Sequence, residues 1–129
     1  IKFVKNTPPP RGLTKKKYDT ISKKASLFFS NFHGYPQLVH TLTYNRHNQD
    51  LHVAGYREEG TITTAFDMRV RNHIDRFHLV LKSLDYLKLD KAVETKIRRE
   101  MNNKLKQHTA YIDEYGVDLP EIENWNWND

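Results

Sequence analysis

The chain contains no cysteine among its 129 residues, so it can form neither disulfide bridges nor thiolate metal sites. This absence agrees with a reducing compartment, and we expect a cytoplasmic protein. There is no long apolar run, and the start at Ile1 does not resemble a signal peptide. We therefore expect no membrane partner. No initiator methionine precedes Ile1, and we expect the chain to be a piece of a longer polypeptide.

Apolar residues are also scarce. Hydrophobic residues make up 37% of the sequence, charged residues make up 29%, and the mean hydropathy is -0.82. The length fits one domain, which we expect to span residues 1–129. However, this composition provides little apolar material for a sheet that is covered on both faces. We therefore expect a domain that depends on its neighbours for part of its burial.

Charge is distributed unevenly between the two parts of the sequence. Residues 1–57 carry ten Lys/Arg and two Asp/Glu, whereas residues 58–129 carry eleven and fourteen. The first part is therefore strongly basic, and a positive field concentrates anions such as nucleic acid or phosphorylated metabolites. A solvated lysine-rich surface is the alternative that we favour.

The first half of the chain alternates strand-like and helix-like segments. Short β-branched or aromatic runs at residues 1–4, 26–32 and 51–56 predict three strands. A helix is expected from Thr14, its predicted N-cap, to about Lys24, with Leu13 and Tyr18 as a hydrophobic staple. A second helix is expected from Pro36, with an inward face made of Leu38, Val39 and Leu42. This alternation is typical of an α/β fold with a mostly parallel sheet.

The second half predicts two long helices. Residues Thr64–Asp67 have capping-box spacing, and the apolar residues that follow recur at helical steps as Phe66, Val70, Ile74, Phe77, Leu81 and Leu84. We therefore expect one long amphipathic helix there. A second helix is expected after Asp90, on the stripe Val93, Ile97, Met101 and Leu105, ending near Tyr115 with Gly116 in the C′ position. The tail through Trp127 is expected to be extended.

Several polar clusters are candidate sites. His33 and Tyr35 lie where a strand is expected to end and a helix to begin, a position at which open parallel sheets bind ligands. A simple turn is the alternative. Further candidate contacts to an anion or a substrate entrance are His40, Arg46 and His47. The spacing of His33, His40 and His47 does not require their side chains to converge, so we predict no metal site.

Other features favour structural roles. Glu58 and Glu59 are adjacent on an extended segment and point to opposite sides, which makes them poor partners for acid–base catalysis. The basic residues Arg69, Arg71 and Arg76 are interleaved with acidic ones, which favours an ion-paired surface over nucleic-acid binding. Trp125 and Trp127 close a very polar chain, and we expect this tail to dock on its own domain or on a partner.

Many short segments, in order, resemble the C-terminal domain of thiamine-diphosphate-dependent phosphoketolases. These segments are His33–His40, Thr43–Arg46, Leu51–Thr64, Phe66–Met68, Asp75–Leu79, Asp118–Ile122 and Trp125–Trp127. The resemblance covers nearly everything after residue 28. It departs at Thr41, Asn45 and Ala54, where the family often has arginine, which weakens an inherited anion-binding role for this face.

The resemblance implies an enzyme that cleaves xylulose 5-phosphate or fructose 6-phosphate with phosphate to give acetyl phosphate. Such an enzyme uses thiamine diphosphate and Mg²⁺, which the resemblance places between its other two domains at the interface of a dimer. For this chain it implies a transketolase-like three-layer sandwich with no catalytic or cofactor-binding residues. Its partners would be the upstream domains and a second subunit, and not nucleic acid. Two alternatives are a stand-alone basic nucleic-acid-binding module and a separately encoded regulatory subunit.

Overall fold

The computed structural model describes residues 14–22, 28–44, 51–58, 60 and 62–126. The chain divides into two compact units, Ile1–Ala54 and Gly55–Asp129, which we call unit 1 and unit 2. The expectation of a single domain over residues 1–129 stays a prediction. No helix among the described residues is long and apolar enough to span a membrane.

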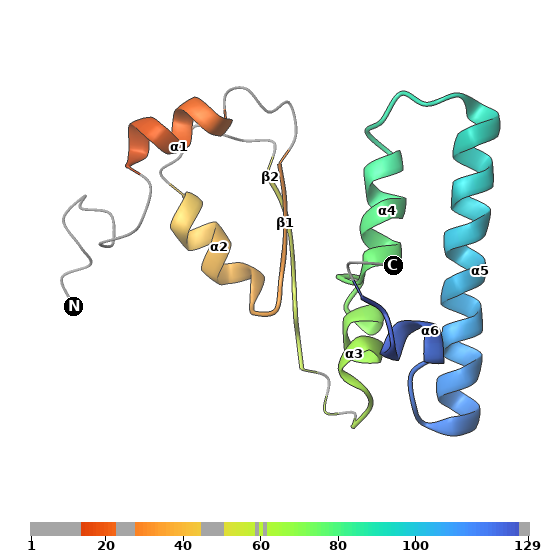
Figure 1. Ribbon diagram of the computed structural model, residues 1–129. Helices are drawn as coiled ribbons and strands as arrows, with labels where there is room; N and C mark the ends of the chain where they lie inside the picture. The colour runs from red at the N-terminus through yellow and green to blue at the C-terminus, as the bar shows by residue number, and fades with distance from the viewer. Residues whose placement is uncertain (1–13, 23–27, 45–50, 59, 61, 127–129) are drawn as a thin grey trace. The chain divides into compact units, whose positions relative to one another are not determined.

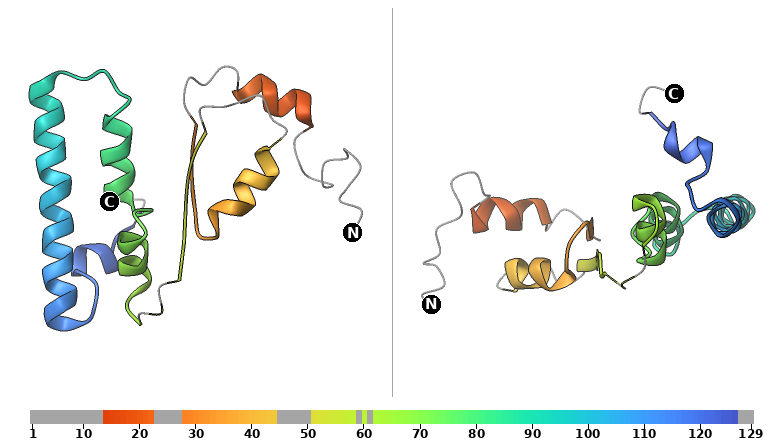
Figure 2. Two further views of the ribbon diagram at one scale, coloured as in Figure 1. Left: turned by 180° about the vertical axis from the view of Figure 1, so that it is seen from behind. Right: turned by 90° about the horizontal axis from the view of Figure 1, so that it is seen from below.

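Unit 1 is a small α/β unit. Its elements are α1 (Lys15–Ser22), β1 (Phe28–Phe32), α2 (Pro36–Thr43) and β2 (Leu51–Gly55), the last residue of which already belongs to unit 2. β1 and β2 form a two-stranded parallel sheet, and both helices lie on the same side of it (Figures 1 and 2). The expected strand at residues 1–4 lies outside the described residues. The mixed α/β class is therefore confirmed.

Local signals in unit 1 explain where its elements begin. The Thr14 hydroxyl accepts a hydrogen bond from the Lys17 backbone N–H at 3.3 Å, as an N-cap does. Leu13 of the predicted staple lies outside the described residues. The turn between β1 and α2 requires Gly34, because a Cβ atom there would lie 2.7 Å from the Phe32 ring. Pro36 then opens α2, where its missing N–H has no intrahelical partner to lose.

The predicted inward face of α2 is wrong. Leu38 is 57% exposed and Leu42 is 66% exposed, whereas Val39 is half-buried. The other half-buried positions are Pro36 and Thr43, which lie three residues before and four residues after Val39 and so share its face of the helix. The helix is thus rotated away from the predicted orientation, and its two leucines point to solvent.

Unit 2 consists of helices, namely α3 (Ala65–Arg71), α4 (Arg76–Leu84), α5 (Lys91–Tyr115) and the short α6 (Pro120–Glu123). α3 and α4 both pack along α5 (Figure 1). The buried apolar side chains of the described residues all belong to this unit, and they are Val70, Phe77, Leu84, Ile112 and Ile122. Unit 2 therefore carries the apolar core that the structure describes.

The single long helix predicted from Thr64 to Leu84 is wrong, because the chain breaks between α3 and α4. Thr64 caps α3 as predicted, accepting a hydrogen bond from the Asp67 N–H at 3.0 Å. The break follows Asn72, where His73 adopts a left-handed φ of 56°. Asp75 then caps a new helix, because its carboxylate accepts hydrogen bonds from the Phe77 and His78 N–H groups at 2.8 and 3.1 Å. The helical spacing of apolar residues continues across this boundary and hides it, whereas Asp75, a preferred N-cap residue, was a signal for a new helix.

The end of unit 2 mixes a confirmed prediction and a wrong one. α5 runs from Lys91 to Tyr115, and Gly116 ends it with a φ of 71°, donating a hydrogen bond to the Ile112 carbonyl at 2.8 Å. The tail was expected to be extended, but Pro120 opens the helical turn α6, whose Ile122 is buried. Trp127 lies outside the described residues.

Candidate functional site

Three of the residues predicted as substrate or anion contacts are described by the structure, and they lie on the surface of unit 1. His33 follows β1, Tyr35 is the N-cap residue of α2, and His40 lies on that helix; all three are exposed, Tyr35 to 63%. Arg46 and His47 lie outside the described residues. The roles of all five residues stay predictions. Among the described residues, no group of three or more His, Cys, Asp or Glu side chains is arranged to hold a metal ion.

Trp125 lies against its own unit. The Arg76 guanidinium carbon sits 5.1 Å from the centroid of the Trp125 ring, and it also lies 5.4 Å from Phe66 and 5.2 Å from Phe77. One cation is thus shared by three aromatic rings, an arrangement that favours stacking of the planar guanidinium. Trp125 remains 48% exposed. A docking role of the tail towards a partner stays a prediction.

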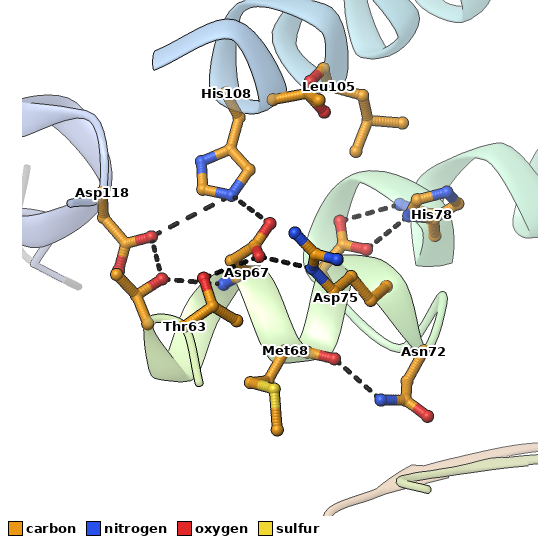
Figure 3. A network of polar contacts seen from close by, with 12 residues as sticks. Thr63, Asp67, Met68, Asn72, Asp75, His78, Leu105, His108 and Asp118 are labelled. Atoms are coloured by element: carbon orange, nitrogen blue, oxygen red, sulfur yellow. Dashed lines mark hydrogen bonds and ion pairs between the residues drawn. The ribbon is translucent and has the colours of Figure 1, made fainter. Parts of the chain in front are cut away.

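Among the described residues, unit 2 contains a buried polar network centred on His108 of α5 (Figure 3). The His108 side chain is fully buried. Its Nε2 atom lies 3.4 Å from Asp67 Oδ1 of α3 and 4.0 Å from Asp118 Oδ1, which belongs to the segment before α6. The imidazole therefore lies between two carboxylates from different parts of the chain. A buried imidazole is favourable only beside such polar partners.

Neighbouring groups satisfy both carboxylates. The Asp67 Oδ2 atom accepts hydrogen bonds from the Thr63 hydroxyl at 2.8 Å and from Arg71 Nε at 2.7 Å. The Thr64 hydroxyl donates to Asp118 Oδ1 at 2.6 Å. Thr64 thereby caps α3 and also holds the segment that leads into α6. The network joins three segments that lie far apart in the sequence.

The electrostatics keep Asp67 ionised. Burial raises the pKa of Asp67. Hydrogen bonds from Arg71 and Thr63 and the nearby charges of Arg71 and His108 lower it, and together they outweigh burial, so the pKa of Asp67 lies below its ordinary value. A carboxylate that stays charged in a buried position requires these donors. Together with the Lys104–Glu121 ion pair at 2.7 Å, which joins α5 to α6, the network fixes the C-terminal segment on the helices.

A second buried carboxylate organises the break between α3 and α4. Asp75 caps α4 and also binds Nδ1 of His78, whose ring stacks at 4.3 Å on that of His73. Burial raises the pKa of Asp75, but its hydrogen bonds from His78 and Phe77 lower it below the ordinary value. Burial and the neighbouring His78 and Lys82 charges lower the pKa of His73, against a smaller opposite effect of Asp75. The carboxylate therefore stabilises a turn in which a non-glycine residue has a positive φ.

Sequence reasoning missed this network. His108 lies three residues after Leu105 and four before Ile112, so it takes a position on the apolar stripe of α5. A histidine on a core stripe needs a buried polar partner, and that requirement was the available signal. The partners Asp67 and Asp118 lie 41 and 10 residues away from it in the numbering, and only the packing of the helices brings them together. The capping-box prediction for Thr64 and Asp67 identified one part of the site.

Comparison with known proteins now decides the family. The family model described as the XFP C-terminal domain matches residues 1–127. The chain belongs to this family. It is 44% identical over 119 residues to a probable phosphoketolase of Mesorhizobium japonicum and 47% identical over 118 residues to probable phosphoketolase 2 of Lactiplantibacillus plantarum. Each alignment covers 92% of this chain but 15% of the relative.

These matches confirm the resemblance to the C-terminal domain of phosphoketolases that the sequence motifs indicated. A probable phosphoketolase of Clostridium acetobutylicum aligns over 99% of the chain at 44% identity, and over 16% of its own length. The chain thus spans a small part of the relatives it matches. These relatives give no support to the alternative of a nucleic-acid-binding module.

Proposed function

We propose that the chain is the structural and subunit-contact domain of a cytoplasmic, thiamine-diphosphate-dependent phosphoketolase. The complete enzyme would cleave xylulose 5-phosphate or fructose 6-phosphate with inorganic phosphate, giving acetyl phosphate and an aldose phosphate. It would act as a dimer, and this domain would contribute to a transketolase-like three-layer sandwich. The observation that carries the proposal is the family match over residues 1–127 in a chain that spans about 15% of its phosphoketolase relatives.

In this proposal the cofactor of such an enzyme is held outside this chain. The diphosphate of thiamine diphosphate is held through Mg²⁺, which needs a set of oxygen ligands. No group of three or more potential ligands of the kinds His, Cys, Asp and Glu converges in the part of the chain that the structure describes. The family resemblance supports this assignment, and the proposal places the cofactor, with its carbon–carbon bond cleavage, in the remainder of the enzyme.

The chain's own polar network supports a scaffolding role. The buried side chains of His108, Asp67 and Asp75 are used to join helices and to cap them, and they face protein groups. Groups that serve as general acids or bases need access to a substrate. The hydrogen bond from Thr64 to Asp118, with His108 of α5 beside Asp67 and Asp118, instead fixes α3, α5 and the segment before α6 relative to one another. The domain thereby presents a defined surface to its neighbours.

A domain replacement tests the proposal. The region of the Lactiplantibacillus plantarum relative that matches this chain would be replaced by the chain itself, and acetyl phosphate formation from xylulose 5-phosphate would be measured. We expect the chimera to be active, and both the truncated relative and the isolated chain to be inactive. A chimera that is folded and dimeric but inactive would contradict the proposal, as would acetyl phosphate formation by the isolated chain.

A further inference from the structure

The exposed face of α2 is the feature of unit 1 that its own fold does not explain. Leu38 and Leu42 lie four residues apart on this helix and are 57% and 66% exposed. Tyr35, at the start of α2, is 63% exposed, and Tyr44, just after its end, is 86% exposed. Tyr35, Leu38 and Leu42 follow one another at helical steps of three and four residues, and we call these three residues the α2 outer face. Tyr44 lies on another side of the helix.

The helix already uses an adjoining face within unit 1. Pro36, Val39 and Thr43 are its half-buried residues, and the Thr43 hydroxyl donates to the Val39 carbonyl at 2.7 Å, which leaves the threonine methyl group free to pack. Leu38 and Leu42 are not among these half-buried residues. The α2 outer face adjoins this half-buried face, since Leu42 lies three residues after Val39. The apolar surface of the helix is therefore wider than the part that unit 1 covers, and an apolar helix surface is covered in the folded protein.

The local composition supports the same conclusion. Residues 33–45 contain no Asp, Glu, Lys or Arg, although charged residues make up 29% of the whole chain. Exposed apolar residues of unit 2 have a different setting, since Val93 on α5 is 49% exposed but lies between Lys91 and Glu94. Single exposed apolar residues among charges are ordinary, whereas an uncharged apolar surface marks an interaction site.

The length of the relatives indicates what covers this surface. The chain accounts for 15% of the length of the Mesorhizobium and Lactiplantibacillus phosphoketolases, so most of such a polypeptide lies outside it. We propose that the α2 outer face docks on an apolar, uncharged surface of this remaining part of the same polypeptide. The inference rests on the proposed function and names the surface through which the domain is held.

Cysteine labelling tests this docking directly, because the chain has no cysteine of its own. Leu42→Cys is introduced into the isolated chain and into the chimera, built on a cysteine-free version of the relative. The rate of reaction with a maleimide is then measured in both. We expect fast labelling in the isolated chain and labelling slower by about tenfold or more in the chimera, because a docked side chain reacts only during local opening. Leu87→Cys, on a residue that is 54% exposed in unit 2, is the matched control and should label equally fast in both proteins.

Three results would overturn the inference. Equal labelling of Leu42→Cys in the isolated chain and in the chimera would show that the face stays free. Slow labelling in the isolated monomer would show that this chain covers the face itself. Dimerisation of the isolated chain that Leu42→Glu abolishes, measured by sedimentation, would make a second copy the occupant.

The two proposals fail in different ways. Acetyl phosphate formation by the chimera reports on the proposed function and does not depend on labelling. An active chimera with an unprotected Leu42→Cys would retain the function and overturn the docking surface. A protected Leu42→Cys in a folded but inactive chimera would retain the docking surface and overturn the function.

Discussion

The two units of this chain differ in how they are stabilised. Unit 2 has buried apolar residues and a polar network around His108. Three of its helices are capped by the side chains of Thr64, Asp75 and Asp90. In unit 1, no residue from 14 to 54 for which the structure gives the burial is buried, and its sheet has two strands. A two-stranded sheet is marginal on its own, and parallel sheets are normally covered on both faces. We therefore expect unit 2 to be the more stable of the two, and unit 1 to gain stability from contacts outside this chain.

The largest effect should come from the core of unit 2. Phe77 is 8% exposed and meets Phe66 edge-on at 5.9 Å, so Phe77→Ala should lower the free energy of unfolding by about 3 to 5 kcal/mol. The matched variant in unit 1 is Leu42→Ala, at a residue that is 66% exposed, and its effect on the isolated chain should stay within about 0.5 kcal/mol. Urea denaturation of both variants measures the difference. Similar losses would remove the contrast between the units.

The buried network should give the next largest effect. His108→Ala removes the imidazole between the buried Asp67 and the half-buried Asp118 and leaves both carboxylates without it, so we expect a loss of about 1 to 3 kcal/mol. His40→Ala, at an exposed histidine of α2, is the control and should change stability by less than about 0.5 kcal/mol. Thermal and urea unfolding of the isolated chain compare the two. A neutral His108→Ala would mean that the network does not contribute to the stability of unit 2.

The cap of α4 should give a smaller and pH-dependent effect. Asp75→Asn keeps a capping residue but loses the charge that binds His78, which should cost about 1 to 2 kcal/mol at neutral pH. Because the pKa of Asp75 is lowered by folding, its charge stabilises the folded state above the ordinary carboxyl range, and this stabilisation is lost as the pH falls through the lowered pKa.

The lowered pKa of His73 acts in the same direction, because a histidine that prefers to be neutral in the folded state destabilises the fold as the pH falls below its ordinary range. Urea midpoints from neutral to acid pH measure the sum of these effects. The stability of the wild-type chain should decrease more steeply on acidification than that of Asp75→Asn. Parallel curves would show that Asp75 is not the responsible carboxylate.

The smallest expected effect concerns the tail. Trp125→Ala removes one of the three rings around Arg76 and should cost about 0.5 to 1 kcal/mol, as a partly exposed cation–π contact does. Val117→Ala, at a residue with a similar exposure of 50%, is the control and should be close to neutral. Thermal melts of the isolated chain compare the two. An unchanged melting temperature for Trp125→Ala would indicate that the indole serves a partner surface and not unit 2.

The sequence predicted the local signals of the fold better than its packing. The helix caps at Thr14, Thr64 and Gly116 depend on neighbouring residues alone, and they were confirmed, as was the start of a helix after Asp90. The single helix from Thr64 to Leu84 was wrong, because apolar periodicity continued through a turn that Asp75 creates. The orientation of α2 was wrong for a related reason. Leu38 and Leu42 were expected to face inward because they are apolar. The sequence of a short helix does not show whether the residues that pack on it belong to this chain.

The candidate site shows the same limit. The role of Thr64 was predictable from a four-residue motif, but its second hydrogen bond, to Asp118, joins residues 54 positions apart. His108 could have been singled out by its polarity on an apolar stripe, whereas its partners could not. Family resemblance was predictable because it rests on many short segments in order, and it does not depend on packing.

Hydrogen exchange tests the central contrast most directly. Amide exchange would be followed in the isolated chain and in the active chimera, with peptides from α2 and β2 compared with peptides from α4 and α5. In the isolated chain we predict strong protection in α4 and α5 and rapid exchange in α2 and β2; in the chimera, only the unit 1 peptides should gain protection. Equal protection of both units in the isolated chain would contradict the account, because unit 1 would then be stable without the rest of the enzyme.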